Sequence, residues 1–264
     1  MKKGPCLLAP FCLMFLLSSC SSYNSNYYTP VNMVMPAIYK QHDALISVAA
    51  CDSKGMEFQG VYSPLKYAAL MYHYMNLPQV MYSDGIGGRG QLSEGGLGGY
   101  YGEFPWSFHL LGGYGKGFAE NTYGPNPGSS NGIELKSRLD FEQWSIQPGF
   151  VLQTRGLRFG MAYRQVWLHY YKGTTDVQAV SQDRLNVLRD IEQKTPFSFG
   201  EFGLTLGFRF RPFTFSYNSV NIFDNSSQYR DMFFKTDNRS FMLTIDLYEL
   251  WRRKDTPPRK QKKR

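Results

Sequence analysis

The sequence predicts an all-β fold, namely an antiparallel up-and-down transmembrane β-barrel of about ten strands. Three observations predict it. Apolar and polar residues alternate with period two in runs of roughly ten residues, the length that a tilted transmembrane strand needs. The chain is rich in aromatic residues (16%) and has 26 glycines, whereas long helical periodicity is almost absent. Finally, the expected joints between strands alternate between tight and long.

The first twenty residues indicate export. Lys2 and Lys3 precede the apolar run 6–17, which is too short for a membrane-spanning helix, and small residues follow. This is the layout of a secretory signal peptide. The ending Leu-Ser-Ser-Cys at 17–20 resembles the lipobox of bacterial lipoproteins, in which the signal is cut before an acylated cysteine. We therefore expect a signal peptide over 1–19, lipidation of Cys20 and a lipidated N-terminal tether over 20–42.

Ten strands are predicted within a barrel over 43–251. Their ranges are 43–51, 55–63, 67–77, 90–103, 106–117, 134–153, 156–172, 197–211, 213–223 and 239–251. In the eighth, Phe202, Leu204 and Leu206 alternate with Gly203, Thr205 and Gly207. A short amphipathic helix is predicted in the loop 173–196, because Thr175 and Gln178 resemble a capping box and apolar residues follow at helical spacing.

A soluble sandwich would also alternate, but two features favour the barrel. The polar face mixes glycines with Arg and Glu, which suits a crowded and curved interior. The joints after the second, fourth, sixth and eighth strands are tight, whereas those after the third, fifth, seventh and ninth are long. Outer-membrane barrels have short periplasmic turns and long external loops. An even strand count then predicts that both termini are periplasmic.

The chain resembles a group of largely uncharacterised outer-membrane β-barrel lipoproteins of Bacteroidota. The residues that carry this resemblance are the lipobox, the segments 27–36, 55–64 and 66–72, and the closing strand 241–251. The resemblance implies the fold and an outer-membrane location, and little about chemistry. A basic tail after the last strand departs from the usual pattern of such barrels.

Charged residues on the polar faces are expected to form a paired network in the lumen, because a charge in a narrow barrel needs a partner. They are Glu57, Glu94, Arg158, Arg164, Glu201, Arg209, Arg211 and Asp246. About ten strands enclose a lumen that side chains nearly fill, whereas aqueous channels need roughly 16 strands. A filled lumen is therefore favoured over an open one.

No catalytic residue, metal site or cofactor is predicted apart from the covalent lipid on Cys20. The four histidines form no H-x-x-x-H pair, and Cys51 is the one cysteine left for other roles in the mature chain. The single rim cluster suited to hydrolysis combines His169 with Asp176 and Asp183 in the following loop.

The net charge of +8 does not indicate nucleic acid, because most of it lies in one segment. The tail 252–264 holds eight basic residues against Asp255, and we expect it to be disordered. The expected partners are outer-membrane lipid and an envelope protein that contacts the loop 173–196 or the basic tail.

The function expected from the sequence is therefore that of a non-catalytic structural or interaction component of the cell envelope, as a subunit of a larger outer-membrane assembly. A narrow channel for small solutes is the first alternative, and a rim-sited hydrolase is the second.

Overall fold

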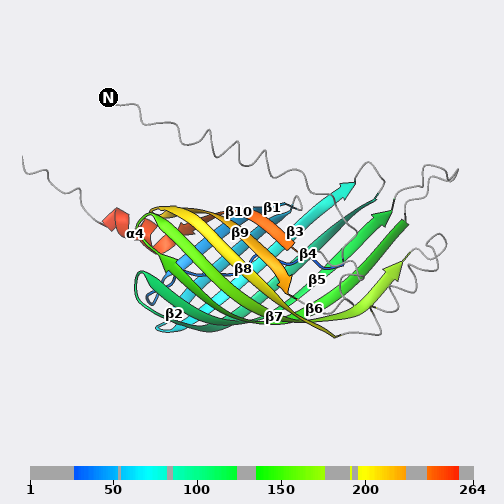
Figure 1. Ribbon diagram of the computed structural model, residues 1–264, viewed down its shortest axis with the longest axis horizontal. Coiled ribbons are helices and arrows are strands. Elements are labelled where there is room, and N and C mark those ends of the chain that lie inside the picture. Colours follow the sequence, from blue (N-terminus) through cyan, green and yellow to red (C-terminus); the bar gives the residue numbers. More distant parts are fainter. Residues whose placement is uncertain are drawn as a thin grey trace, which may run out of the picture.

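The protein is a closed barrel of ten antiparallel strands, each paired with its neighbours in the sequence, and the first strand pairs with the last (Figure 1). This computed structural model describes residues 27–52, 55–81, 86–123, 135–175, 191, 196–223 and 237–255. The predicted fold class is confirmed. The strands are β1 (Ala44–Cys51), β2 (Met56–Leu65), β3 (Ala68–Met81), β4 (Ile86–Tyr101), β5 (Trp106–Tyr123), β6 (Leu135–Gln153), β7 (Leu157–Thr175), β8 (Phe197–Phe210), β9 (Phe213–Phe223) and β10 (Asp237–Asp246).

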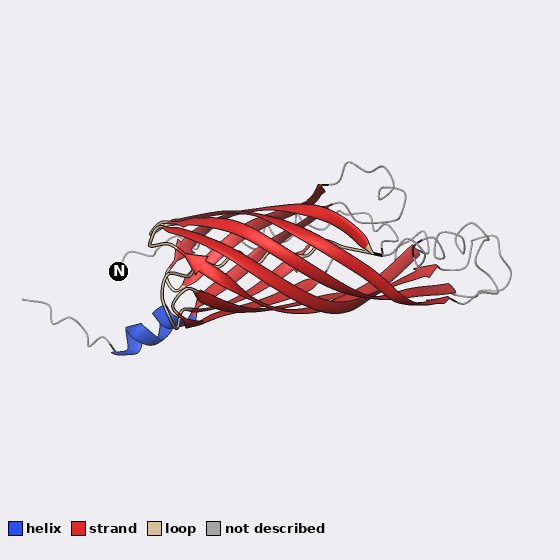
Figure 2. Cartoon of the chain, turned by 90° about the horizontal axis from the view of Figure 1, so that it is seen from below, coloured by secondary structure: helices blue, strands red, loops and turns tan. Residues whose placement is uncertain are grey.

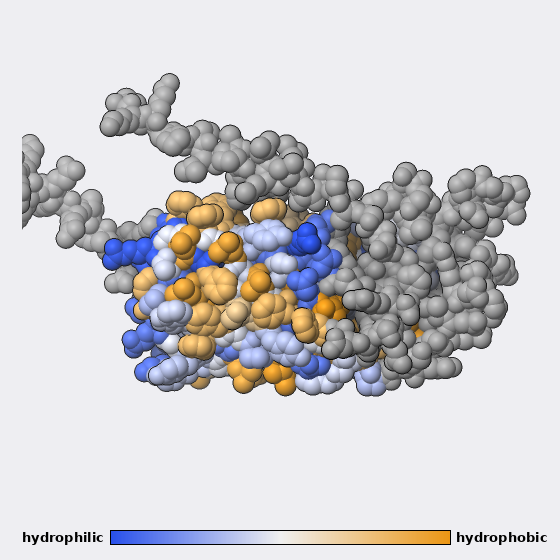
Figure 3. Space-filling model, viewed as in Figure 1, coloured by the Kyte–Doolittle hydropathy of each residue, from blue (hydrophilic) through white to orange (hydrophobic). Residues whose placement is uncertain are grey.

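The strands obey the predicted alternation. Along β8, Leu204, Leu206 and Phe208 are exposed, whereas Thr205, between the two leucines, and Arg209, after Phe208, are buried. The outward residues form an apolar belt over the middle of the strands, with hydrophilic side chains toward both ends (Figure 3). Its members include Phe58, Leu70, Leu97, Phe108, Leu110, Ile146, Phe159, Met161, Leu204, Leu206, Phe208 and Phe210. Such a belt suits contact with lipid.

The two ends of the barrel differ. We call the end where β2, β4, β6 and β8 finish the turn end, because few residues separate each from the next strand. The opposite end is the loop end. There β3 to β7, with 14 to 19 residues each, extend beyond β1, which has 8 residues, and β10, which has 10. Figure 2 shows that the strands reach unequally far at this end, opposite the end that carries the helix. The strands β3, β4 and β5 are longer toward the loop end than the sequence predicted.

The lumen contains an extended stretch of the chain itself, residues 27–38, which we call the luminal segment. Val31 and Ile38 have no exposed surface, and Tyr28, Met33 and Met35 are almost as buried. The sequence predicts that these residues belong to a tether over 20–42. The difference arises because side chains of the wall hydrogen-bond the backbone of the segment and so provide the partners that a buried extended chain needs.

The luminal segment runs from one mouth of the barrel to the other. Ser107, at the turn-end start of β5, donates to the carbonyl of Ile38 at 3.0 Å. The Tyr27 hydroxyl lies 2.6 Å from that of Ser137, near the loop-end start of β6. The chain therefore enters from the loop end, whereas β10 leaves at the turn end. The prediction that both termini are periplasmic stays a prediction, because residues 1–26 and 256–264 lie outside the described residues.

The C-terminal part also differs from the prediction of a strand to residue 251. β10 ends at Asp246, and the helix α4 (Leu247–Asp255) follows at the turn end (Figure 1). The Asp246 carboxylate accepts a hydrogen bond from the backbone N–H of Glu249 at 3.0 Å, as an N-cap residue does. The predicted boundary of a disordered tail at 252 therefore moves, since the helix continues to Asp255.

The helix predicted in the loop 173–196 lies almost wholly outside the described residues. Its described member Ile191 has no exposed surface and belongs to an apolar cluster with Tyr27, Tyr28 and Phe199 at the loop end of the lumen. Among the described parts of the chain, no helix is both long and apolar enough to cross a membrane.

Candidate functional site

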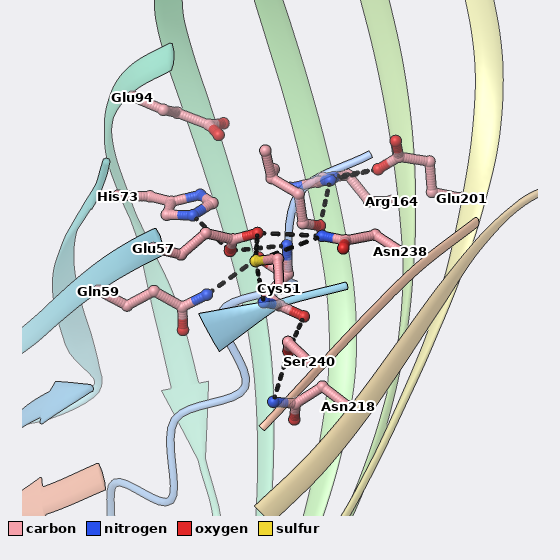
Figure 4. Close-up of polar contacts among 12 residues, drawn as sticks. Cys51, Glu57, Gln59, His73, Glu94, Arg164, Glu201, Asn218, Asn238 and Ser240 are labelled. Carbon is pink, nitrogen blue, oxygen red and sulfur yellow. Dashed lines mark hydrogen bonds and ion pairs between the residues drawn. The ribbon is translucent and has the colours of Figure 1, made fainter. Parts of the chain in front are cut away.

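The polar side chains of the lumen gather around the luminal segment, and the first group surrounds Glu57 on β2 (Figure 4). The Glu57 carboxylate lies 3.0 Å from His73 Nε2 and accepts hydrogen bonds from the Cys51 thiol at 3.1 Å and from the Asn238 amide at 3.0 Å. It also accepts the backbone N–H of Asn32 at 3.0 Å. Four donors around one buried carboxylate satisfy it, and one of them belongs to the luminal segment.

A second group is built on the ion pair of Arg164 from β7 and Glu201 from β8. Arg164 Nε donates to Glu201 Oε2 at 2.6 Å, and the Tyr28 hydroxyl donates to Glu201 Oε1 at 2.7 Å. Arg164 also donates to the carbonyl of Val31 at 3.0 Å. Arg164 and Glu201 are at most 2% exposed. Removal of either side chain would leave the other as a buried charge without a counter-ion, which would destabilise the fold.

Glu94 on β4 forms a third group with two neutral partners. Ser145 donates to its carboxylate at 2.6 Å and Gln143 at 3.3 Å. The carboxylate fits only because residue 113 is a glycine, since a Cβ there would lie 2.1 Å from Glu94 Oε1. This close approach explains one member of the glycine-rich stretch that the sequence shows on β5.

Side chains of the barrel wall hold the luminal segment mainly by donating hydrogen bonds to the backbone carbonyl groups of that segment. Besides Arg164 and Ser107, three wall side chains donate to these carbonyl groups. They are Gln59, which donates to the carbonyl of Asn32 at 3.0 Å, Gln147, which donates to that of Val34 at 2.6 Å, and Arg158, which donates to that of Met35. Because every residue has a backbone carbonyl, these contacts recognise an extended polypeptide rather than a particular side chain.

The turn end of the lumen opens into a cavity of about 710 Å³ that is lined by Tyr39, Asp43, Arg209, Arg211 and Glu249, among others. Arg209 and Arg211 donate to Glu249 on α4 at 2.8 and 3.2 Å. Burial raises the pKa of the Asp43 carboxyl above its ordinary value, although the backbone N–H groups of Tyr39 and Lys40 donate to it and act in the other direction. This mouth of the barrel is thus charged and accessible.

The eight charged residues predicted to share one network fall into separate groups. Six are buried in the lumen: Glu57, Glu94, Arg158, Arg164, Glu201 and Arg209. Arg211 and Asp246 lie at the turn-end mouth, where their side chains are 46% and 22% exposed. The single network is replaced by local groups because the luminal segment lies between the walls and supplies many of the contacts itself.

Sequence reasoning missed the residues that complete these groups, among them Tyr28, Asn32, His73, Ser145 and Asn238. The period-two alternation places His73 on the inner face of β3, between Met71 and Met75, so its position could have been found. Tyr28 and Asn32 belong to the luminal segment, which has no strand-like periodicity, and no local signal marks them as luminal.

The Glu57 group contains a cysteine and a histidine but not the arrangement of a cysteine hydrolase. In such an enzyme the histidine takes the proton of the thiol. Here Glu57 separates the two, and all three side chains are buried. Over the described ranges, no group of three or more His, Cys, Asp or Glu side chains could hold a metal ion.

His169 of the predicted rim cluster faces outward on β7, where its Nδ1 lies 3.4 Å from Glu142 Oε1. The Tyr114 hydroxyl donates to the same carboxylate at 2.8 Å, and Lys116 Nζ lies 3.9 Å from it. Asp176 and Asp183, the other expected members, lie outside the described residues, as does Cys20.

The fold and the lumen together define the class of the protein, an outer-membrane-type β-barrel with a segment of its own chain in the lumen. No protein-family model and no curated protein match the chain. Among solved structures it is similar to LpxR from Salmonella typhimurium, with 8% identity and a TM-score of 0.35 over 77% of this chain and 99% of that chain.

The comparison corrects the function expected from the sequence. LpxR is an enzyme of the outer membrane. A fold does not by itself determine a function, so the barrel does not indicate a non-catalytic role. The expectation of a non-catalytic structural or interaction component rested on the barrel fold and the absence of a motif, and it is withdrawn.

Proposed function

We propose that the protein is a narrow channel of the bacterial outer membrane that its own luminal segment closes. The observation that carries this proposal is that an extended chain, rather than the side chains of the wall alone, occupies the lumen from one mouth to the other. The long loops would face the exterior, and the turn end with its cavity would face the periplasm.

The chemistry of the wall supports a polar passage. Without the luminal segment, the inner face would present Gln59, Gln147, Arg158 and Arg164 to the lumen, each of which now donates to a backbone carbonyl. These donors would then need water or a solute as a partner. Ten strands fall between the filled barrels of eight and the open porins of 16, so a passage for small solutes suits this size.

The contact of the luminal segment with the glycines of the wall gives a direct test. A Cβ at Gly203 would lie 2.7 Å from Met33 Sδ and 2.9 Å from Met35 Cε, whereas at Gly95, on the outer face of β4, it would meet nothing within 4 Å. In planar bilayers, wild type and Gly95→Val should show little conductance. Gly203→Val should show frequent opening steps, because valine displaces the luminal segment.

A second variant separates a displaced segment from a damaged barrel. Deletion of residues 27–38 should give a continuously open pore in protein that still migrates as a folded barrel on gels without heating. A folded deletion variant that conducts no ions would contradict the channel.

Lipidation of Cys20 is part of the proposal, and the apolar belt supports direct contact with membrane lipid in addition. Replacement Cys20→Ala should prevent incorporation of a palmitate analogue, which the wild type should incorporate. The belt should hold the variant in the membrane, because its buried apolar surface far exceeds that of one anchor. Label on the Cys20→Ala protein would contradict this assignment.

A rim-sited hydrolase is the second candidate, and the pair of His169 and Glu142 favours it. The pair lies on the outer face two residues beyond Trp167, at the level where lipid headgroups meet an aromatic girdle. A histidine oriented by a carboxylate can act as a general base for water, and Lys116 beside it could attract a phosphate. Hydrolysis of lipid esters by the purified protein should be lost in His169→Ala and retained in Gln165→Ala, which alters the same face of β7. Equal activity of the two variants would exclude His169.

A further inference from the structure

The direction of the luminal segment fixes the side from which its N-terminal end leaves the barrel. The Tyr170 hydroxyl donates to the carbonyl of Tyr27 at 3.0 Å. On β7, Tyr170 lies three residues beyond Trp167 toward the loop end, and Trp167 pairs with Trp144 of β6. These two exposed tryptophans mark the loop-end edge of the apolar belt. Tyr27 thus lies beyond the apolar belt, on the loop side.

Few residues connect Tyr27 to the predicted lipid acceptor. Cys20 precedes Tyr27 by seven residues, which reach at most about 25 Å when fully extended. The apolar band of an outer-membrane barrel is itself about 25 Å tall. Three residues of a tilted strand add roughly 8 Å between Tyr27 and the edge of the belt. The opposite leaflet would therefore be about 33 Å away along the membrane normal, which is out of reach.

The route to the opposite leaflet is also unfavourable. The lumen is occupied by residues 27–38, and a chain outside the barrel would have to cross hydrocarbon with its backbone groups unsatisfied. The connecting residues 21–26 are Ser, Ser, Tyr, Asn, Ser and Asn, whose polar side chains would add to this cost.

We infer that Cys20 is acylated on the loop side of the membrane, so that its acyl chains enter the leaflet beside the long loops. The inference rests on the lipidation proposed above and is independent of channel activity. The lipidated end of the mature chain and the helix α4 then lie on opposite sides of the membrane, because α4 follows β10 at the turn end. The lipid also holds the luminal segment at its loop end, because withdrawal toward the turn end would pull the acyl chains out of the membrane.

Epitope insertions in the full-length chain test the inference. A tag after Ser22 reports the side of Cys20, a tag after Gly128 reports the loop between β5 and β6, and a tag after Lys260 reports the turn end. On intact cells, the Ser22 and Gly128 tags should be reached by antibody alike, and the Lys260 tag should be reached only after permeabilisation. A Ser22 tag with the accessibility of the Lys260 tag would overturn the inference.

Two controls keep this result interpretable. Each tagged protein should migrate as a folded barrel before heating, and the Ser22-tagged protein should incorporate a palmitate analogue while its Cys20→Ala version does not. A folded protein without that label would overturn the lipid part of the inference. If the protein is not a channel, the conductance measurements described above would show this, and the accessibility of the three tags to antibody would be unchanged.

Discussion

The two halves of the luminal segment are held by different chemistry. In the loop-end half, residues 27–34, Tyr28 contacts the ion pair of Arg164 and Glu201, and Asn32 contacts the carboxylate of Glu57. The turn-end half consists of residues 35–38. There the Arg158 guanidinium donates to the carbonyl of Met35, and the Ser107 hydroxyl donates to the carbonyl of Ile38. The loop-end half also packs in an aromatic cluster, whereas the turn-end half borders the open cavity.

This difference indicates where the segment is fixed and where it is more easily released. Charges that are paired within a buried site are costly to separate, whereas a hydrogen bond to one neutral carbonyl contributes about 0.5–3 kcal/mol. Opening of the lumen should therefore begin at the turn end. The four predictions below test this comparison, from the largest expected effect to the smallest.

Replacement of the loop-end cation should have the largest effect. Arg164→Met leaves Glu201 buried without its counter-ion and should lower the free energy of unfolding by about 3–5 kcal/mol. Urea titration in detergent micelles would measure it. The double variant Arg164→Met/Glu201→Gln should recover much of the loss, and a double variant as unstable as the single one would contradict the role of the pair.

A charge on the outer face provides a reference that does not involve the luminal segment. Leu204→Arg places a charge among lipid chains and should cost about 2–4 kcal/mol near the middle of the membrane. Thr205→Arg, one residue away, should be destabilising by a different route, because Thr205 is 2% exposed and an arginine overfills the lumen there. Conductance distinguishes the two, since the Thr205 variant alone should disturb the luminal segment. Equal conductance would indicate that residue 205 does not face that segment.

Removal of the turn-end cation should have a smaller effect on stability. Arg158→Met loses the hydrogen bond to Met35 but leaves no carboxylate unpaired, so about 1–3 kcal/mol is expected. Opening events should nevertheless increase more than in Gly95→Val. A stability loss as large as that of Arg164→Met would refute the distinction between the two halves.

The smallest effect is expected at Ser107. Ser107→Ala removes one neutral hydrogen bond to the carbonyl of Ile38 and should cost about 0.5–1.5 kcal/mol. Hydrogen exchange of the segment's amides should quicken toward residue 38 and remain unchanged near residue 28. Uniform acceleration along the segment would mean that it is released as one unit.

The sequence by itself determined the barrel, because lipid on one side and a crowded lumen on the other impose period two on every strand. The inner positions of Glu57, Arg164 and Glu201 follow from that alternation, and so does the outer position of Leu204. The end of β10 was not predicted, because alternating apolar residues continue past Asp246, and a residue that can cap a helix does not by itself end a strand.

Only the tertiary structure decided what the inner side chains contact. Strand periodicity indicates which face of the barrel wall a residue occupies. Closure of the barrel and the position of the luminal segment determine which residues lie opposite it across the lumen. Met33 and Met35 lie against Gly203, 170 and 168 positions away in the chain, and no local pattern encodes that contact. The direction of the luminal segment, and with it the side from which Tyr27 leaves, arises from hydrogen bonds between residues as distant as Tyr27 and Tyr170, which form only when the barrel is closed.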